Sequence, residues 1–189
     1  MMYRSVVLLA SLVAATAAFA QQKPSSTPPA PPPPPAAAPI SAEPTSTTAS
    51  FGDWVLRCQK VEAVRACEVG QSITVQGQSG PIAQLAIGRP APKEKLRLTI
   101  VLPNNVTLTA PVRLGTGEKA DQGLSLAWRR CLTVGCFADN ELPDDQLRRY
   151  RMTSEPGRLV FQDGAGRELA LPFSFNGLAQ ALDALARES

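Results

Sequence analysis

The sequence predicts an all-β domain, a sandwich or a barrel, with a short helix around 143–152 and a second helix at the C-terminus. Three observations support this fold class. Apolar and polar residues alternate along many short segments, turn-forming residues separate these segments, and only two stretches have helical periodicity. The segment 51–189 is also long enough to bury a hydrophobic core of its own.

About eight segments have the period-two pattern of β-strands. They are DWVLRC, CEVGQSITV, IAQLAI, KLRLTIVLP, VTLTAPVRL, LSLAW and the two arms of RLVFQDGAGRELALPF. In VTLTAPVRL, the apolar residues from Val106 through Leu108 to Leu114 fall on one face. Between the last two arms, the turn 163–166 is rich in glycine, which tolerates positive φ, so we expect a β-hairpin there. Trp54 and Trp128 are expected to be core residues rather than platforms for a ligand.

Two stretches predict helices. LPDDQLRRYRM has Pro143 near its first position, acidic residues in its first turn and arginines in its last turn, as the helix dipole favours. NGLAQALDALARES has an apolar stripe, which we expect to cover an open end or edge of the sandwich. The stripe consists of Leu178, Ala181, Leu182 and Leu185.

The N-terminal part predicts export. Residues 1–20 have the organisation of a cleavable signal peptide, with Arg4, an apolar stretch and the cleavage motif Ala18-Phe19-Ala20. Its uncharged run is shorter than the roughly 18–20 residues that span a bilayer, so no integral membrane span is expected after signal removal. Residues 21–50, rich in proline, alanine, serine and threonine, predict a disordered linker. The folded domain is then 51–189, located in the periplasm or outer envelope.

Four cysteines, Cys58, Cys67, Cys131 and Cys136, predict two disulfides in an exported chain, although their number permits three pairings. The C-x4-C spacing of Cys131 and Cys136 suits a disulfide across a short hairpin. A catalytic dithiol would favour C-x-x-C at a helix N-terminus, so a redox-active thiol protein is the less favoured interpretation. Cys58 and Cys67 can be bridged across their intervening loop in the same way.

The chain contains no histidine, which excludes Ser-His-Asp and Cys-His catalytic sites and zinc sites that mix cysteine with histidine. The unequal cysteine spacings do not match zinc knuckles, so we expect no metal, no cofactor and no catalytic residue. The net charge of +3 and the single arginine cluster at 148–151 give no basis for nucleic-acid binding. A glycine-rich hairpin turn also explains Asp163 and Glu168 more simply than half of a calcium loop does.

Carboxylates remain as candidates for a hydrolase, because an acid and a base suffice for glycoside hydrolysis. The candidates are Asp53, Glu68, Asp139, Glu141, Asp144, Asp145 and Asp163. The sequence places no two of them at the required separation. We therefore prefer the interpretation that they are scattered surface acids.

The domain resembles the invasion-associated locus B family of exported bacterial proteins. The resemblance rests on the order of GDWVLRC, ACEVGQ, LTIVLPNNVTL, CLTVGCFA and LPFSFNGLAQALDAL, and it covers residues 51 to about 185. It implies an immunoglobulin-like β-sandwich, the local disulfides Cys58–Cys67 and Cys131–Cys136, and no enzymatic activity. The family takes its name from pathogen members that are needed for entry into host cells. Asn104-Asn105 departs from the family pattern of an apolar residue and glycine.

The sequence therefore predicts an exported, non-enzymatic envelope protein that binds another envelope protein or a host protein and is linked to invasion in pathogens. The alternative is a carboxylate-dependent envelope hydrolase. The residues do not identify the partner.

Overall fold

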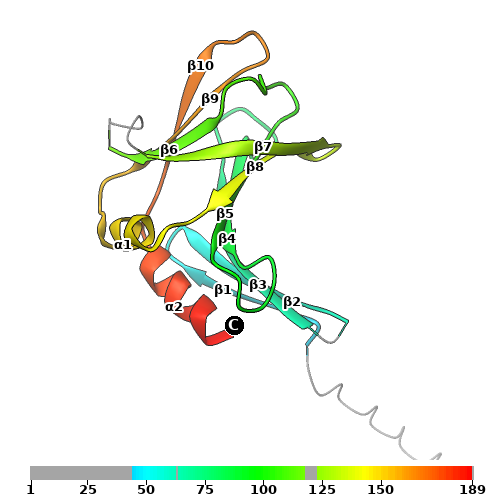
Figure 1. Ribbon diagram of the computed structural model, residues 1–189, viewed down its shortest axis with the longest axis vertical. Coiled ribbons are helices and arrows are strands. Elements are labelled where there is room, and N and C mark those ends of the chain that lie inside the picture. Colours follow the sequence, from blue (N-terminus) through cyan, green and yellow to red (C-terminus); the bar gives the residue numbers. More distant parts are fainter. Residues whose placement is uncertain (1–43, 63, 118–122, 189) are drawn as a thin grey trace, which may run out of the picture. The chain divides into compact units, whose positions relative to one another are not determined.

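The computed structural model describes residues 44–62, 64–117 and 123–188 (Figure 1). The expected signal peptide and linker up to residue 43 lie outside the described residues. The described strands are β1 (Ser46–Phe51), β2 (Trp54–Val61), β3 (Val64–Ile73), β4 (Ala83–Gly88), β5 (Arg97–Leu102), β6 (Val112–Thr116), β7 (Leu124–Leu132), β8 (Gly135–Glu141), β9 (Gly157–Gln162) and β10 (Glu168–Phe173). The helices are α1 (Asp144–Met152) and α2 (Leu178–Glu188).

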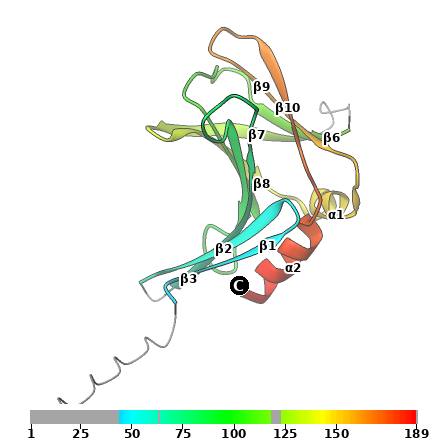
Figure 2. The same ribbon diagram turned by 180° about the vertical axis from the view of Figure 1, so that it is seen from behind.

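All described strand pairs are antiparallel, and together they form one sheet in the order β1-β2-β3-β4-β5-β8-β7-β6-β9-β10. Strand β7 joins the two halves of this sheet, β1 to β5 with β8 on one side and β6, β9 and β10 on the other. Its first residues pair with β6 and its later ones with β8, and the register shifts between Trp128 and Arg130. A strand that bends and changes partners in this way forms the corner of a sandwich. Figures 1 and 2 show the sheet curving around α1 and α2, so the predicted all-β fold with two helices is confirmed.

The core lies on the concave face of the sheet. The alternation predicted for KLRLTIVLP is confirmed, because Leu98, Ile100 and Leu102 of β5 are all buried. Leu85 and Ile87 of β4 are buried beside them. The opposite, outer face of the same strands carries polar and small residues, and this face contains the candidate site described below.

The predicted strand VTLTAPVRL is only partly correct. Val106 forms a single isolated bridge with Asp163, and β6 begins at Val112. Between them, Leu108 is 52% exposed. Pro111 explains the interruption, because a proline has no N–H to donate to a strand ladder. The period-two pattern alone does not reveal this break.

The expected linker also ends earlier than the sequence predicts. Residues 46–50, assigned to the linker, belong to β1, which pairs with β2 from Ser46 opposite Gln59 to Phe51 opposite Trp54. These serines, threonines and alanine are mostly exposed, so no apolar alternation marks the strand. Backbone hydrogen bonds at a sheet edge do not require apolar side chains, and sequence periodicity therefore missed β1.

Both helices follow the pattern read from the sequence. In α1 the acidic residues lie in the first turn and Arg149 and Arg151 in the last. Arg151 forms an ion pair with Asp183 of α2, at 2.5 Å. The predicted apolar stripe of α2 is buried, and the helix packs on β1, β2 and β3. Among the described residues, no helix is long and apolar enough to cross a membrane.

Tyr150 stabilises the domain, and this contribution is lost at alkaline pH. Its ring is buried against Phe175, with centroids 5.1 Å apart, and its hydroxyl donates to the Leu114 carbonyl at 3.1 Å. Burial raises the pKa of Tyr150 to about 12, whereas an unfolded tyrosine has a pKa of 10.0. The contribution is therefore fully present below pH 10 and is lost as the pH rises towards 12.

We expect the wild type to lose about 2–3 kcal/mol from this group between about pH 10 and pH 12. Denaturant titrations of the wild type and Tyr150→Phe at several alkaline pH values measure it, because the phenylalanine cannot ionise. Parallel losses of stability in the two proteins over this range would contradict the assignment.

Candidate functional site

Three segments that are distant in the sequence meet at the backbone of Ser174. The Trp54 indole N–H donates to the Ser174 carbonyl at 2.9 Å. The Gln71 side-chain amide donates to the same carbonyl at 3.0 Å, and its oxygen accepts from the Ser174 N–H, also at 3.0 Å. We call Trp54, Gln71 and Ser174 the clasp. It ties the β10–α2 connection to β2 and β3, and it contains residues from GDWVLRC, ACEVGQ and LPFSFNG.

Two glycines allow the chain to approach closely beside the clasp. Gly177 has φ +86°, and a Cβ there would lie 1.9 Å from the Phe51 carbonyl oxygen. Gly52 has φ +55°, and a Cβ there would lie 2.8 Å from the Asn176 carbonyl oxygen. That oxygen accepts the Asp53 N–H at 3.1 Å. These motif glycines therefore have a structural role, as the rest of the clasp does.

The two predicted local disulfides are confirmed: Cys58 pairs with Cys67 and Cys131 with Cys136. Each links residues that face one another across a hairpin, with Cα atoms 4.0 and 3.9 Å apart. Glu188 places a carboxylate oxygen within 4.8 Å of the Cys58 and Cys67 sulfurs. These sulfurs are oxidised, and a metal would need thiolates, so the cluster does not fit a metal centre. The Glu188 carboxylate contacts Arg65 at 2.9 Å instead.

Most of the seven candidate carboxylates contact a basic side chain. The pairs are Glu68–Arg57, Asp139–Arg97, Asp139–Arg129, Glu141–Lys95, Asp145–Arg149 and Asp163–Arg167. Of the other two, Asp53 accepts a long bond of 3.5 Å from the Asn176 amide, and Asp144 begins α1.

Asp139 and Glu141 are two residues apart on β8, so their side chains lie on the same face of the strand. Asp139 is held between Arg97 and Arg129 at 2.5 and 3.0 Å. The Glu141 carboxylate accepts a hydrogen bond from Lys95, which raises the pKa of that lysine. Both carboxylates thus bind cations, Asp139 on the neighbouring strands β5 and β7 and Glu141 in the β4–β5 connection, which favours a structural role over an acid–base pair.

Asp163 organises the β9–β10 turn. One carboxylate oxygen accepts the N–H groups of Ala165 and Arg167, both at 2.9 Å, and the other accepts the Arg167 side chain at 2.8 Å. Hydrogen bonding from the Arg167 backbone, with the Arg167 side chain second, lowers the pKa of Asp163. The turn is thus a hairpin stabilised by its own aspartate, in agreement with the simpler of the two sequence interpretations.

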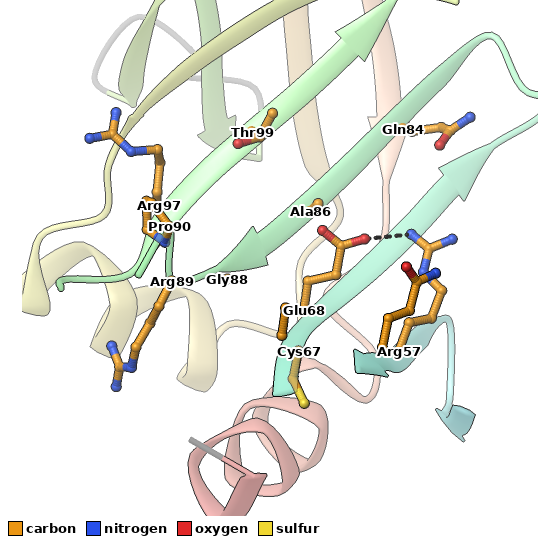
Figure 3. Close-up of a pocket in the computed structure, with 12 residues that line it drawn as sticks. Arg57, Cys67, Glu68, Gln84, Ala86, Gly88, Arg89, Pro90, Arg97 and Thr99 are labelled. Atoms are coloured by element: carbon orange, nitrogen blue, oxygen red, sulfur yellow. Dashed lines mark hydrogen bonds and ion pairs between the residues drawn. The ribbon is translucent and has the colours of Figure 1, made fainter. Parts of the chain in front are cut away.

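A hollow of about 610 Å³ lies on the outer face of strands β2 to β5 (Figure 3). We call it the trough. It is lined by Arg57, Gln59, Ala66, Cys67, Glu68, Gln84, Ala86, Gly88, Arg89, Pro90, Arg97 and Thr99. Ala86 and Gly88 of β4 supply little side-chain volume, so the centre of the sheet face stays low between longer side chains on either side.

Arginines stand on both sides of the small residues of β4 (Figure 3). On one side, Arg57 contacts Glu68 at 3.3 Å. A Cβ at Gly70 would lie 2.7 Å from the Arg57 guanidinium, so this glycine leaves space for the arginine to lie across the sheet. On the other side, Arg97 contacts Asp139, and Arg89 donates to the Glu94 carbonyl at 3.1 Å.

The trough is positively charged. Its lining contains Arg57, Arg89 and Arg97 against the acid Glu68. With Asp139, which pairs with Arg97, the formal excess is 3 − 2 = +1. Each guanidinium has five N–H donors, more than the contacts above use, and can bind a carboxylate or phosphate through two of them. The arrangement therefore suits an anionic ligand.

No local pattern of the sequence marks the trough. The alternation assigns Arg57 and Arg97 to the outer face, because each precedes or follows a buried residue. Only the register, with Arg57 opposite Glu68, Glu68 opposite Gly88 and Gly88 opposite Arg97, brings them together.

Comparison with known proteins agrees with the fold and the motifs. The sequence matches the family described as invasion associated locus B (IalB) protein over residues 54–186. The chain belongs to the IalB family. Its structure is similar to a crystal structure of invasion associated protein B from Bartonella henselae, with a TM-score of 0.62 and 18% identity over 75% of this chain and 95% of that chain. At this identity the likeness shows the fold alone. A comparison with curated proteins gave no match.

The IalB-family domain contains two disulfides, which are typical of proteins that fold outside the cytoplasm. The clasp and the local cysteine pairs give most of the quoted motifs a structural role, because their residues hold the domain together. The trough lies apart from the clasp, on the other face of the sheet.

Proposed function

We propose that this IalB-family chain is an exported, non-enzymatic binding protein of the bacterial envelope, and that the trough binds an acidic segment of a partner protein. The positive charge of the trough is the observation on which this proposal rests. Residues 1–20 would act as the signal peptide, and the proline-rich residues that follow would act as a spacer to the domain. The invasion-associated names of the family and of the Bartonella protein support a partner on the host cell or in the envelope during invasion.

The shape of the trough also favours a binding role. It lies across several strands of an open sheet face, which gives an extended acidic segment room to contact arginines on both sides of β4. Ionic contacts across such a surface guide association and set specificity. The alternative of a carboxylate-dependent hydrolase has less support, because the acids nearest the trough contact Arg57, Arg97 and Lys95.

Arg89 is the most informative residue to change. Removing Arg57 or Arg97 would also take an ion-pair partner from Glu68 or Asp139, whereas the bond described for Arg89 goes to a backbone carbonyl. We expect Arg89→Gln to weaken binding of a short, fluorescein-labelled, glutamate-rich peptide about tenfold, because one charged hydrogen-bonding group is lost. Fluorescence anisotropy at low and high salt measures this, and added salt should weaken binding by the wild type.

Arg148→Gln is the matched control. Arg148 is an exposed arginine of α1 outside the trough, so both variants lose the same charge. It should bind the peptide as the wild type does. Equal weakening in the two variants would show that only net charge matters, and it would contradict a site at the trough. Failure of the wild type to bind at low salt would also contradict it.

A further inference from the structure

The β7–β8 turn exposes aliphatic side chains on a covalently closed loop. Val134 is 75% exposed and Leu132 is 48% exposed. The disulfide between Cys131 and Cys136 closes the turn directly behind them. Gly135 packs so closely on β5 that a Cβ there would lie 2.5 Å from the Leu102 carbonyl oxygen. Turns at a protein surface usually carry polar residues, and this one holds two apolar side chains in a fixed position.

Neighbouring connections surround this apolar turn with uncharged residues, both polar and apolar. The β3–β4 connection, 74–82, and the residues after β5, 103–105, lie at the same end of the sheet as the turn 132–135. Residues of all three segments, among them Pro81, Pro103 and Val134, line one hollow of about 280 Å³, with Val75 45% exposed in the first segment. We call the three segments the apolar end. They contain no charged residue, whereas the β4–β5 connection at the opposite end has four, at 89 and 93–95.

Positive charge lies directly behind the apolar end. Arg130 of β7 is exposed and stacks over the Phe137 ring, with its guanidinium carbon 5.5 Å from the ring centroid. Arg129, next to it on the same strand, contacts the carboxylate of Asp139 at 3.0 Å. These two arginines and one aspartate have a formal charge of 2 − 1 = +1. An apolar tip with cations behind it is complementary to an anionic lipid surface, where the tip enters the acyl boundary and the cations meet the phosphates.

We propose that the apolar end docks on an anionic lipid bilayer, with Leu132 and Val134 entering the surface and Arg130 contacting lipid phosphates. This inference rests on the envelope location in the proposed function. The residue types favour lipid over a protein partner, because leucine and valine are under-represented among the residues that dominate protein interfaces. Docking there would leave the trough, on the outer face of the sheet, available to its own ligand.

A local probe tests the proposal in the full chain. In V134W the introduced indole should shift its emission to shorter wavelength when phosphatidylglycerol vesicles are added, and lipids with a doxyl group on the acyl chain should quench it. L169W, at an exposed leucine of β10, is the control and should show neither effect. Difference spectra against the wild type remove the signals of Trp54 and Trp128. The apolar N-terminal residues can attach the full chain to vesicles by themselves, so the decisive readout is quenching at position 134.

A second variant tests the charge. With V134W as background, Arg130→Gln should raise the phosphatidylglycerol concentration needed for half of the emission shift about fivefold. On phosphatidylcholine vesicles the same substitution should leave the emission response unchanged. No quenching at position 134, or equal quenching in V134W and L169W, would overturn the proposal. The trough is tested separately: V134W should still bind the glutamate-rich peptide, and Arg89→Gln should leave the vesicle response intact.

Discussion

Replacing Trp54 with alanine is expected to lower the free energy of unfolding by about 3–5 kcal/mol. The side chain is 1% exposed, and its indole N–H donates to the Ser174 carbonyl, so the change removes both a large packed ring and one bond of the clasp. Denaturant titration of the oxidised protein, followed by far-UV circular dichroism, measures the loss.

Trp54→Phe separates the two contributions, because it keeps an aromatic ring and removes the N–H donor. We expect it to retain more stability than Trp54→Ala. Gln59→Ala, at an exposed position of the same strand, should change stability by less than about 0.5 kcal/mol. A loss below about 1 kcal/mol in Trp54→Ala would contradict the structural role assigned to the clasp.

The second large effect is expected for Gln71→Leu, which should lower the free energy of unfolding by about 2–3 kcal/mol. Leucine fills a similar volume but leaves the Ser174 N–H without the acceptor that Gln71 provides. The Asp53 carbonyl, which accepts from the same amide at 3.3 Å, loses a donor as well. The same denaturant titration measures the effect.

Gln59→Leu makes the identical chemical change at an exposed position of β2 and should be nearly neutral. Because Trp54 and Gln71 bond the same Ser174 carbonyl, Trp54→Phe and Gln71→Leu should be coupled by about 0.5 kcal/mol or more in a double-mutant cycle. Additive losses would indicate that the two side chains act independently and that no clasp exists.

Features encoded by local periodicity were predictable from the sequence. The burial of Leu98 and Ile100 follows from period-two alternation, and the buried stripe of α2 follows from helical spacing. Features that depend on backbone pairing were not. Strand β1 has no apolar alternation because it pairs only at an edge, and Pro111 interrupts an alternating pattern that continues through it.

The trough and the clasp depend on contacts between distant segments. Gln71 was visible as part of a family motif, but its partner is 103 residues away along the chain, so its role required the structure. Arg57 and Arg97 were visible only as polar positions of two separate strands. The strand order and register turn them into opposite sides of one trough, and neither is encoded by any local pattern.

The most direct test of the central proposal is site-specific photocrosslinking in the native envelope. A photoreactive amino acid would replace Gln84, which lines the trough, and in a second protein Arg158, which is exposed on β9. The proposal predicts a discrete adduct with a partner protein from position 84 that is absent from position 158 and is weakened by Arg89→Gln. No adduct from position 84, or the same adducts from both positions, would contradict a binding site at the trough.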